Sequence, residues 1–216
     1  MSLSIKQIIF IFGKHYIMTK FYSIVILLAV LGLTACTNKQ PTQSQSVSEG
    51  KTDGQKLAEA YQNKDWETVV SIGDTLIGEK DTMNLTVPYS EALAVTGNSQ
   101  KALSILDKKL ESSPDDYYLY QTKGNVYYLI EKFDSAIVNY EKVISLKPTY
   151  ARPYINEAEI YEIIGDKPRA IANYLAAARL FSANNFFGET IEYANKILSL
   201  DPTNVEAKEL LNAASN

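Results

Sequence analysis

The sequence has few of the residues on which catalytic and metal sites depend. Its 216 residues include one cysteine, one histidine and one tryptophan. A single cysteine cannot form an intrachain disulfide, and His15 lies close to the start of the chain. Zinc sites and Cys/His catalytic pairs need more thiolate and imidazole groups than this. Phosphate-binding loops and the motifs HExxH, CxxC and GxGxxG are also missing. We therefore expect no metal, no cofactor and no enzymatic activity.

Positive charge is also scarce. The chain carries 21 Lys and Arg against 25 Asp and Glu, a formal net charge of −4. Such a surface repels a phosphate backbone and releases no counterions from it, so we expect no nucleic-acid partner. Apolar residues, in contrast, make up 46% of the chain. They are enough to bury the core of one folded domain of ordinary size.

The first 35 residues have the three-part order of a secretory signal peptide. Lys14 and Lys20 supply positive charge, residues 21–33 are apolar, and two small residues precede Cys36. The apolar stretch is shorter than the roughly 20 residues that a membrane-spanning helix needs, so a permanent transmembrane anchor is the weaker interpretation. Met18 directly precedes this compact signal and is an alternative start of the chain.

The four residues Leu33-Thr34-Ala35-Cys36 resemble the lipobox of bacterial lipoproteins. The resemblance implies that the leader is cleaved before Cys36 and that Cys36 is acylated, and several acyl chains together hold firmly to a bilayer. A soluble secreted protein, with Cys36 as a bystander, is the alternative. The next residues, Thr37-Asn38-Lys39, hold neither an aspartate beside the cysteine nor an acidic cluster. By the same resemblance, this implies an anchor in the outer membrane that faces the periplasm.

Residues 36–51 form a polar segment in which Val47 is the only sizeable apolar residue. Such a segment cannot bury enough apolar surface to offset its ordering entropy, so we expect a flexible tether. Its mean reach would be roughly 20–25 Å, which keeps the rest of the chain near the membrane. Cleavage before Cys36 removes three lysines and no acidic residue, which leaves 18 basic and 25 acidic residues and a net charge near −7.

From about residue 52 onward the sequence repeats with a period of 34. Alanines recur at this spacing, a large residue follows each of them four positions later, and prolines recur as well. These residues are Ala102, Ala136 and Ala170, then Leu106, Tyr140 and Tyr174, and finally Pro114 and Pro148. A repeat of this length indicates stacked hairpins of helices. Tyr120, Gly124 and Tyr127 share one helix face, where the small Gly124 allows a second helix to approach closely.

The best copy, residues 117–150, resembles a tetratricopeptide repeat (TPR), with Lys123 where a leucine is usual. The resemblance implies an all-α fold, a TPR-type right-handed superhelix (α-solenoid) of about four to five helix-turn-helix repeats over residues 52–216. We place the repeats at 50–83, 83–116, 117–150 and 151–184, with a shortened repeat at 171–204 and a capping helix at 203–214. One helix at about 168–182 fits both of the last two repeats. The sequence leaves open whether it belongs to one repeat or is shared by two.

In TPR proteins the first helix of each repeat lines a concave groove. The resemblance therefore implies partner-binding residues on the helix face opposite the Gly124 contact. We call this set the groove face: Tyr118, Gln121, Asn125 and Tyr128 in one repeat, and Arg152, Ile155, Glu159 and Glu162 in the next. The face is aromatic at its centre and acidic at one end. It suits a partner segment with apolar anchors and some positive charge.

Two of these features also have simpler interpretations. The chain has 15 tyrosines, and several of them occupy core positions of the repeat, so Tyr118 and Tyr128 are equally open to a packing role. The glutamates at 157, 159 and 162 resemble paired catalytic carboxylates. On a helix they spread over more than one face, and we expect a solvated helix surface instead.

The sequence thus predicts a lipid-anchored TPR adaptor of a bacterial cell envelope, which holds a partner protein or peptide near the membrane within an assembly or secretion complex. In layout it resembles the small TPR lipoproteins that serve outer-membrane protein assembly and pilus secretin assembly. The alternative is a helical accessory lipoprotein that captures a nutrient or glycan. A tryptophan-rich groove would favour that alternative, and Trp66 is the only tryptophan. Neither the partner nor the oligomeric state follows from the sequence.

Overall fold

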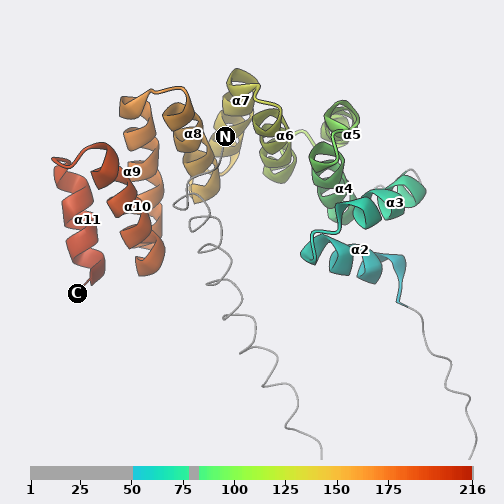
Figure 1. The fold of residues 1–216 in the computed structure, drawn as a ribbon, viewed down its shortest axis with the longest axis horizontal. Coiled ribbons are helices and arrows are strands. Elements are labelled where there is room, and N and C mark those ends of the chain that lie inside the picture. The colour runs from blue at the N-terminus through green and yellow to red at the C-terminus, as the bar shows by residue number, and fades with distance from the viewer. Residues whose placement is uncertain (1–50, 78–82, 216) are drawn as a thin grey trace, which may run out of the picture. The chain divides into compact units, whose positions relative to one another are not determined.

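The computed structural model describes residues 51–77 and 83–215. The predicted signal peptide (1–35), the predicted lipidation of Cys36 and all of the predicted tether except Lys51 lie outside these residues. The described residues form ten α-helices and no strand, so the all-α prediction is confirmed (Figure 1). The helices are α2 (Asp53–Gln62), α3 (Trp66–Leu76), α4 (Met83–Val95), α5 (Ser99–Ser112), α6 (Tyr117–Leu129), α7 (Phe133–Leu146), α8 (Ala151–Ile163), α9 (Lys167–Ala183), α10 (Phe187–Leu200) and α11 (Val205–Ser215). In the part of the chain so described, every helix is too short or too polar to cross a bilayer.

Short polar side chains start several of these helices by accepting hydrogen bonds from backbone N–H groups that lack a partner within the helix. A capping box starts α2. The Asp116 side chain accepts from the Tyr118 N–H at 2.9 Å, and the Asp166 side chain accepts from the Arg169 N–H at 3.1 Å. These caps fix where α6 and α9 begin, and hence which of their residues face neighbouring helices.

The helices are joined by two kinds of connection. After α2, α4, α6, α8 and α9 the chain turns within three residues, through one residue in the left-handed region with φ between 57° and 87°. These turn residues are Lys64, Gly97, Glu131, Gly165 and Asn185. After α5, α7 and α10 a four-residue link follows, and each link contains a proline, which cannot supply the N–H that continues a helix. The short turns therefore join helices within a hairpin, and the proline links separate hairpins.

Helix α9 departs from this alternation because it has a short turn at both ends. It packs against α8 and α10 and also contacts α11. It therefore stands in the place of a second helix relative to α8 and of a first helix relative to α10. The predicted sharing of this helix by two repeats stays a prediction, and the connectivity supports it.

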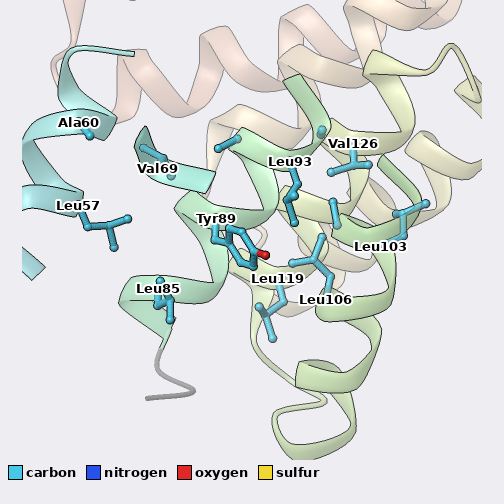
Figure 2. Packing of buried hydrophobic residues seen from close by; sticks show 13 residues of the cluster. Leu57, Ala60, Val69, Leu85, Tyr89, Leu93, Leu103, Leu106, Leu119 and Val126 are labelled. Carbon is cyan, nitrogen blue, oxygen red and sulfur yellow. The ribbon is translucent and has the colours of Figure 1, made fainter. Parts of the chain in front are cut away.

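Glycines allow paired helices to approach closely. A Cβ added at Gly124 would overlap the ring of Tyr140 on α7, as expected from the repeat pattern, and one at Gly73 would overlap the ring of Tyr89 on α4. Both tyrosines are fully buried. Figure 2 shows Tyr89 within the apolar cluster of α2 to α6, in which burial of each large side chain contributes roughly 1.5–3 kcal/mol.

Candidate functional site

The two aromatic residues of the groove face lie at opposite ends of α6. Tyr118 is 50% exposed, and its ring centroid lies 4.1 Å from that of Tyr117. Tyr117 in turn accepts a 2.7 Å hydrogen bond from the Lys147 Nζ. Tyr128 is half-buried, with its ring centroid 6.1 Å from that of Phe133. Tyr118 is therefore the more accessible of the two to a partner.

Asn125, midway along α6, is the centre of a hydrogen-bond network that we call the Asn125 network. Its side-chain oxygen accepts hydrogen bonds from the Gln121 amide at 2.9 Å, the Tyr140 hydroxyl at 3.0 Å and the Asn156 amide at 3.2 Å. These donors come from α6, α7 and α8. Asn125 thus holds neighbouring helices together, and only part of its polar surface remains for a partner.

The Asn125 network continues to the first described helices through Glu91 of α4. The Asn125 amide hydrogen-bonds the Glu91 carboxylate, which also accepts from the Tyr61 hydroxyl of α2. Burial raises the pKa of Glu91 above its usual value and outweighs these two hydrogen bonds, which lower it. Both donors are neutral groups, so they stabilise the carboxylate without adding an opposite charge.

Gln121, a predicted member of the groove face, is only 6% exposed. Its Nε2 donates to Asn125, but its Oε1 has no hydrogen-bond partner among the described residues. Such a buried acceptor costs about 1–3 kcal/mol unless water or a ligand supplies a donor. Gln121 therefore offers a partner little surface, and its unpaired oxygen is buried as well.

On α8, the first two residues of the groove face differ in exposure. Arg152 is exposed in the first turn of the helix. Ile155 is 2% exposed and belongs to an apolar cluster formed by α8, α9, α10 and α11. Ile155 is thus a core residue with little surface for a partner, and Arg152 is the accessible one of the pair.

The two acidic residues of the groove face are both half-buried. Burial and the negative charge of Glu159 on α8 raise the pKa of the Tyr128 hydroxyl on α6. Glu162 accepts a 2.6 Å hydrogen bond from the Tyr174 hydroxyl and forms a 2.9 Å ion pair with Lys196 of α10. Helix α10 therefore reaches the acidic end of the groove face.

Glu157 does not lie on the solvated surface of α8 that the sequence predicts. It is 5% exposed, so that expectation is wrong for this residue. Burial, together with the charge of Glu141 on α7, raises its pKa to about 7, and a hydrogen bond from Asn173 on α9 opposes the shift. Because its neighbours belong to α7 and α9, Glu157 lies inside the helix stack rather than on the groove face.

One set of exposed apolar residues is not among the residues predicted from the sequence. The last residues of α4, α6 and α8 are Val95, Leu129 and Ile163, which are 51%, 49% and 55% exposed. They are 34 residues apart and so occupy the same place in three successive hairpins, directly after Tyr128 and Glu162 in two of them. We call these three residues the apolar row. The 34-residue period contains this signal, provided that it is read at exposed helix ends as well as at core positions.

A pocket of about 790 Å³ lies between α2 and α4. Its apolar lining comes from Leu57, Ala58, Leu76, Leu85, Val87 and Pro88. Tyr61, which belongs to the Asn125 network, also lines it, so the pocket adjoins the polar groups of the groove face. No sequence motif marks this pocket.

Two further groups bear on the chemistry of the site. In the part of the chain that the structure describes, no three His, Cys, Asp or Glu residues gather into a candidate metal site. Trp66, on which the glycan alternative would depend, is half-buried and packs edge-on against Tyr61, with 5.7 Å between the ring centroids. Trp66 therefore serves the packing of α2 against α3.

Comparisons with known proteins agree with this architecture. Residues 124–165 match the TPR repeat family, whereas curated protein sequences give no match. Similar solved structures include MamA, with 15% identity over 75% of this chain and 87% of that chain and a TM-score of 0.54. Another is TTC0263, a thermophilic TPR protein of Thermus thermophilus, with 13% identity over 74% of this chain and 95% of that chain and a TM-score of 0.52. The described helices therefore have the fold of a TPR-type α-solenoid, with a matching TPR repeat at residues 124–165.

Proposed function

We propose that the chain is a membrane-anchored adaptor, which holds a partner protein or peptide against the groove face within a cell-envelope assembly or secretion complex. The TPR-type fold is that of protein–protein interaction scaffolds. The observation that carries the proposal is the apolar row. Three aliphatic side chains stay about half exposed at the same place in successive hairpins, and an apolar surface that recurs in this way is typical of an interaction site.

The spacing of the apolar row describes the partner. Helices α4 and α6 pack against each other, and packed helices lie about 8–10 Å apart, so Val95 and Leu129 should lie at about that distance, with Ile163 next on α8. An amphipathic helix repeats its anchors every seven residues, or about 10.5 Å, and a polyproline II segment every three residues, or about 9 Å. The carboxylate of Glu91 adds an acidic acceptor. A partner with regularly spaced apolar residues and N–H or cationic donors fits these groups.

The membrane attachment rests on the sequence Leu33-Thr34-Ala35-Cys36 and on the polar tether that follows it. Acylated Cys36 would insert in the outer membrane, and the tether would hold the helices in the periplasm within roughly 20–25 Å of that surface. Mass spectrometry of the processed N-terminal peptide tests this part. We expect acyl groups on Cys36 and none in a Cys36→Ala variant, and an unmodified thiol would contradict the anchor.

Partner recovery tests the adaptor. In envelopes treated with a cross-linker, we expect the full-length chain to retain a partner and Leu129→Ser with Tyr118→Ala to lose about nine-tenths of it, because each tenfold loss needs only about 1.4 kcal/mol. Val138→Ser is the matched control, since Val138 is a 63% exposed aliphatic residue on α7, outside the groove face. Equal recovery from the folded double variant and the control would refute the groove proposal. Asn125 is avoided here because its loss would break hydrogen bonds between helices.

A further inference from the structure

The pocket between α2 and α4 borders a position at which α2 lacks a side chain that later hairpins possess. The residue ten positions before the left-handed turn residue is Gly54 in α2, Val87 in α4, Gln121 in α6 and Ile155 in α8. Gln121 and Ile155 are buried, and Val87 is half-buried. A Cβ added at Gly54 would meet nothing within 4 Å, and Gly54 lines the pocket. The following hairpins fill this position with their own side chains, whereas the first leaves it open.

The pocket has the chemistry of a site for an apolar side chain. Leucines from α2, α3 and α4 form its walls together with Val87 and Pro88. Its volume of about 790 Å³ leaves room for a large side chain and the backbone next to it. Pockets of this size and lining commonly bind ligands through apolar contact, and a few polar groups fix the orientation.

One of those polar groups is the backbone carbonyl of Asn84. Pro88 lies inside α4 and has no N–H, so the carbonyl four residues earlier loses the donor that an ordinary helical residue would provide. Both Asn84 and Pro88 line the pocket. The carbonyl of this lining residue therefore lacks its helical donor. A backbone N–H, which a polypeptide has and a fatty acyl chain lacks, can replace that donor.

The second polar group is the Glu91 carboxylate at the Tyr61 side of the pocket. Tyr61 lines the pocket and donates its hydroxyl hydrogen to Glu91. Since Tyr61 and Asn125 are neutral donors, the charge of Glu91 still favours a nearby cation. A basic residue next to an apolar one in the ligand would satisfy both groups.

We propose that this pocket anchors the partner segment. It takes one large aliphatic or aromatic side chain of an extended peptide, whose backbone N–H donates to the Asn84 carbonyl and whose neighbouring Lys or Arg faces Glu91. The inference rests on the proposed adaptor function and adds to it the identity of the anchoring residue.

A random 12-residue peptide library displayed on phage is the probe. It is selected on the full-length chain held in lipid nanodiscs, so that no free detergent competes for the pocket, and the enriched peptides are then synthesised for fluorescence anisotropy. Gly54→Phe fills the pocket from within. Gly188→Phe is the matched control, because Gly188 is also the second residue of a helix and also has nothing within 4 Å of an added Cβ.

We expect the enriched peptides to share a large apolar residue beside Lys or Arg. They should bind the wild type and Gly188→Phe equally and bind Gly54→Phe at least about tenfold more weakly. N-methylation of one amide next to the anchor residue should weaken binding, because it removes the donor to Asn84. Glu91→Gln should weaken peptides with Lys or Arg more than versions with Gln in that place.

Several results would overturn the anchor. The first is a selection that enriches no peptides, or only peptides without an apolar residue. The second is unchanged peptide binding to Gly54→Phe. The third is a pocket that binds no peptide but holds a lipid, which palmitate displaces. If Gly54→Phe does not fold, Gly54→Leu makes the same test with a smaller side chain. Failure of the anchor is distinguishable from failure of the adaptor. Loss of the partner with Leu129→Ser and Tyr118→Ala but not with Gly54→Phe removes the anchor alone, whereas wild-type recovery of the partner from both variants removes both proposals.

Discussion

The first hairpin and the central hairpins share the helix-turn-helix pattern but differ in the side chain at one position of their first helix. In α6 and α8 the face is occupied by the chain itself, through Gln121 and Ile155, which are nearly fully buried. In α2 the matching position is Gly54, and a pocket lies there. The same position in the repeat thus holds a buried side chain in the central hairpins and open space in the first. The regular hairpins show what the first one lacks.

Replacing glycines by leucine should produce the largest contrast between the two regions. Gly124→Leu would drive a side chain into the ring of Tyr140 and should lower the free energy of unfolding by about 3 kcal/mol. Gly54→Leu enters open space in a helix and should raise it by about 0.5 kcal/mol. Urea unfolding followed by circular dichroism measures both. Equal losses would mean that the first hairpin is as tightly packed as the central one.

The buried Glu157 should make the stability of the central hairpins depend on pH. Its folded-state pKa of about 7 lies above that of an unfolded glutamate, so the folded chain binds the proton more tightly. The stabilisation is fully present at low pH and is lost as the pH rises toward 7. Between about pH 5 and pH 8 the free energy of unfolding should fall by about 2 kcal/mol from this group.

Glu157→Gln is the control for that pH dependence. It keeps the shape of the side chain and removes its titration, so the stability curve should flatten over the same range. Glu141, exposed on α7, contributes to the shift through its charge, and Glu141→Gln should reduce the slope in part. A wild-type curve without slope in this range would show that Glu157 is not buried as the structure has it.

The left-handed turns should respond alike in both regions. Lys64 follows α2 with φ 57° and Glu131 follows α6 with φ 58°, where a side chain is disfavoured and glycine is not. Lys64→Gly and Glu131→Gly should each raise the free energy of unfolding by about 0.5–1 kcal/mol, and Gly165→Ala should lower it by a similar amount. Thermal unfolding detects the changes. A gain at one turn but not at the other would mean that the first hairpin differs in more than Gly54.

The smallest effect is expected at the acidic end of the groove face. Lys196→Met removes the ion pair with Glu162 but leaves the Tyr174 hydrogen bond in place. Because both partners are partly exposed, the loss should be about 0.5 kcal/mol, or a fall in Tm of about 1–2 °C. A loss several times larger would show that this ion pair between α10 and α8 is not screened by solvent as an exposed pair is.

The fold could be predicted from the sequence because several signals share one period. Gly124 and the alanines at 34-residue spacing define the helix contacts, and the prolines mark the links between hairpins. Each signal acts locally, so each can be recognised without knowledge of the neighbours.

The candidate site could be predicted only in part, because exposure depends on which helices cover a face. Spacing places Ile155 and Glu159 on one side of α8, but the cluster of α9, α10 and α11 covers Ile155 and leaves Glu159 half-buried. The α2–α4 pocket escaped prediction for a related reason. Gly54 leaves open space at its position, and whether that space forms a pocket depends on where the neighbouring helices lie.

The hydrogen bonds of the Asn125 side chain allow only one orientation of its carboxamide. Its oxygen already meets three donors and its nitrogen faces a carboxylate, so a half rotation would set N–H against N–H and oxygen against oxygen. Hydrogen bonds at one side chain thus link α6 to α4, α7 and α8, and Glu91 extends the link to α2. A disturbance of Tyr61 at one end should therefore reach Asn156 at the other.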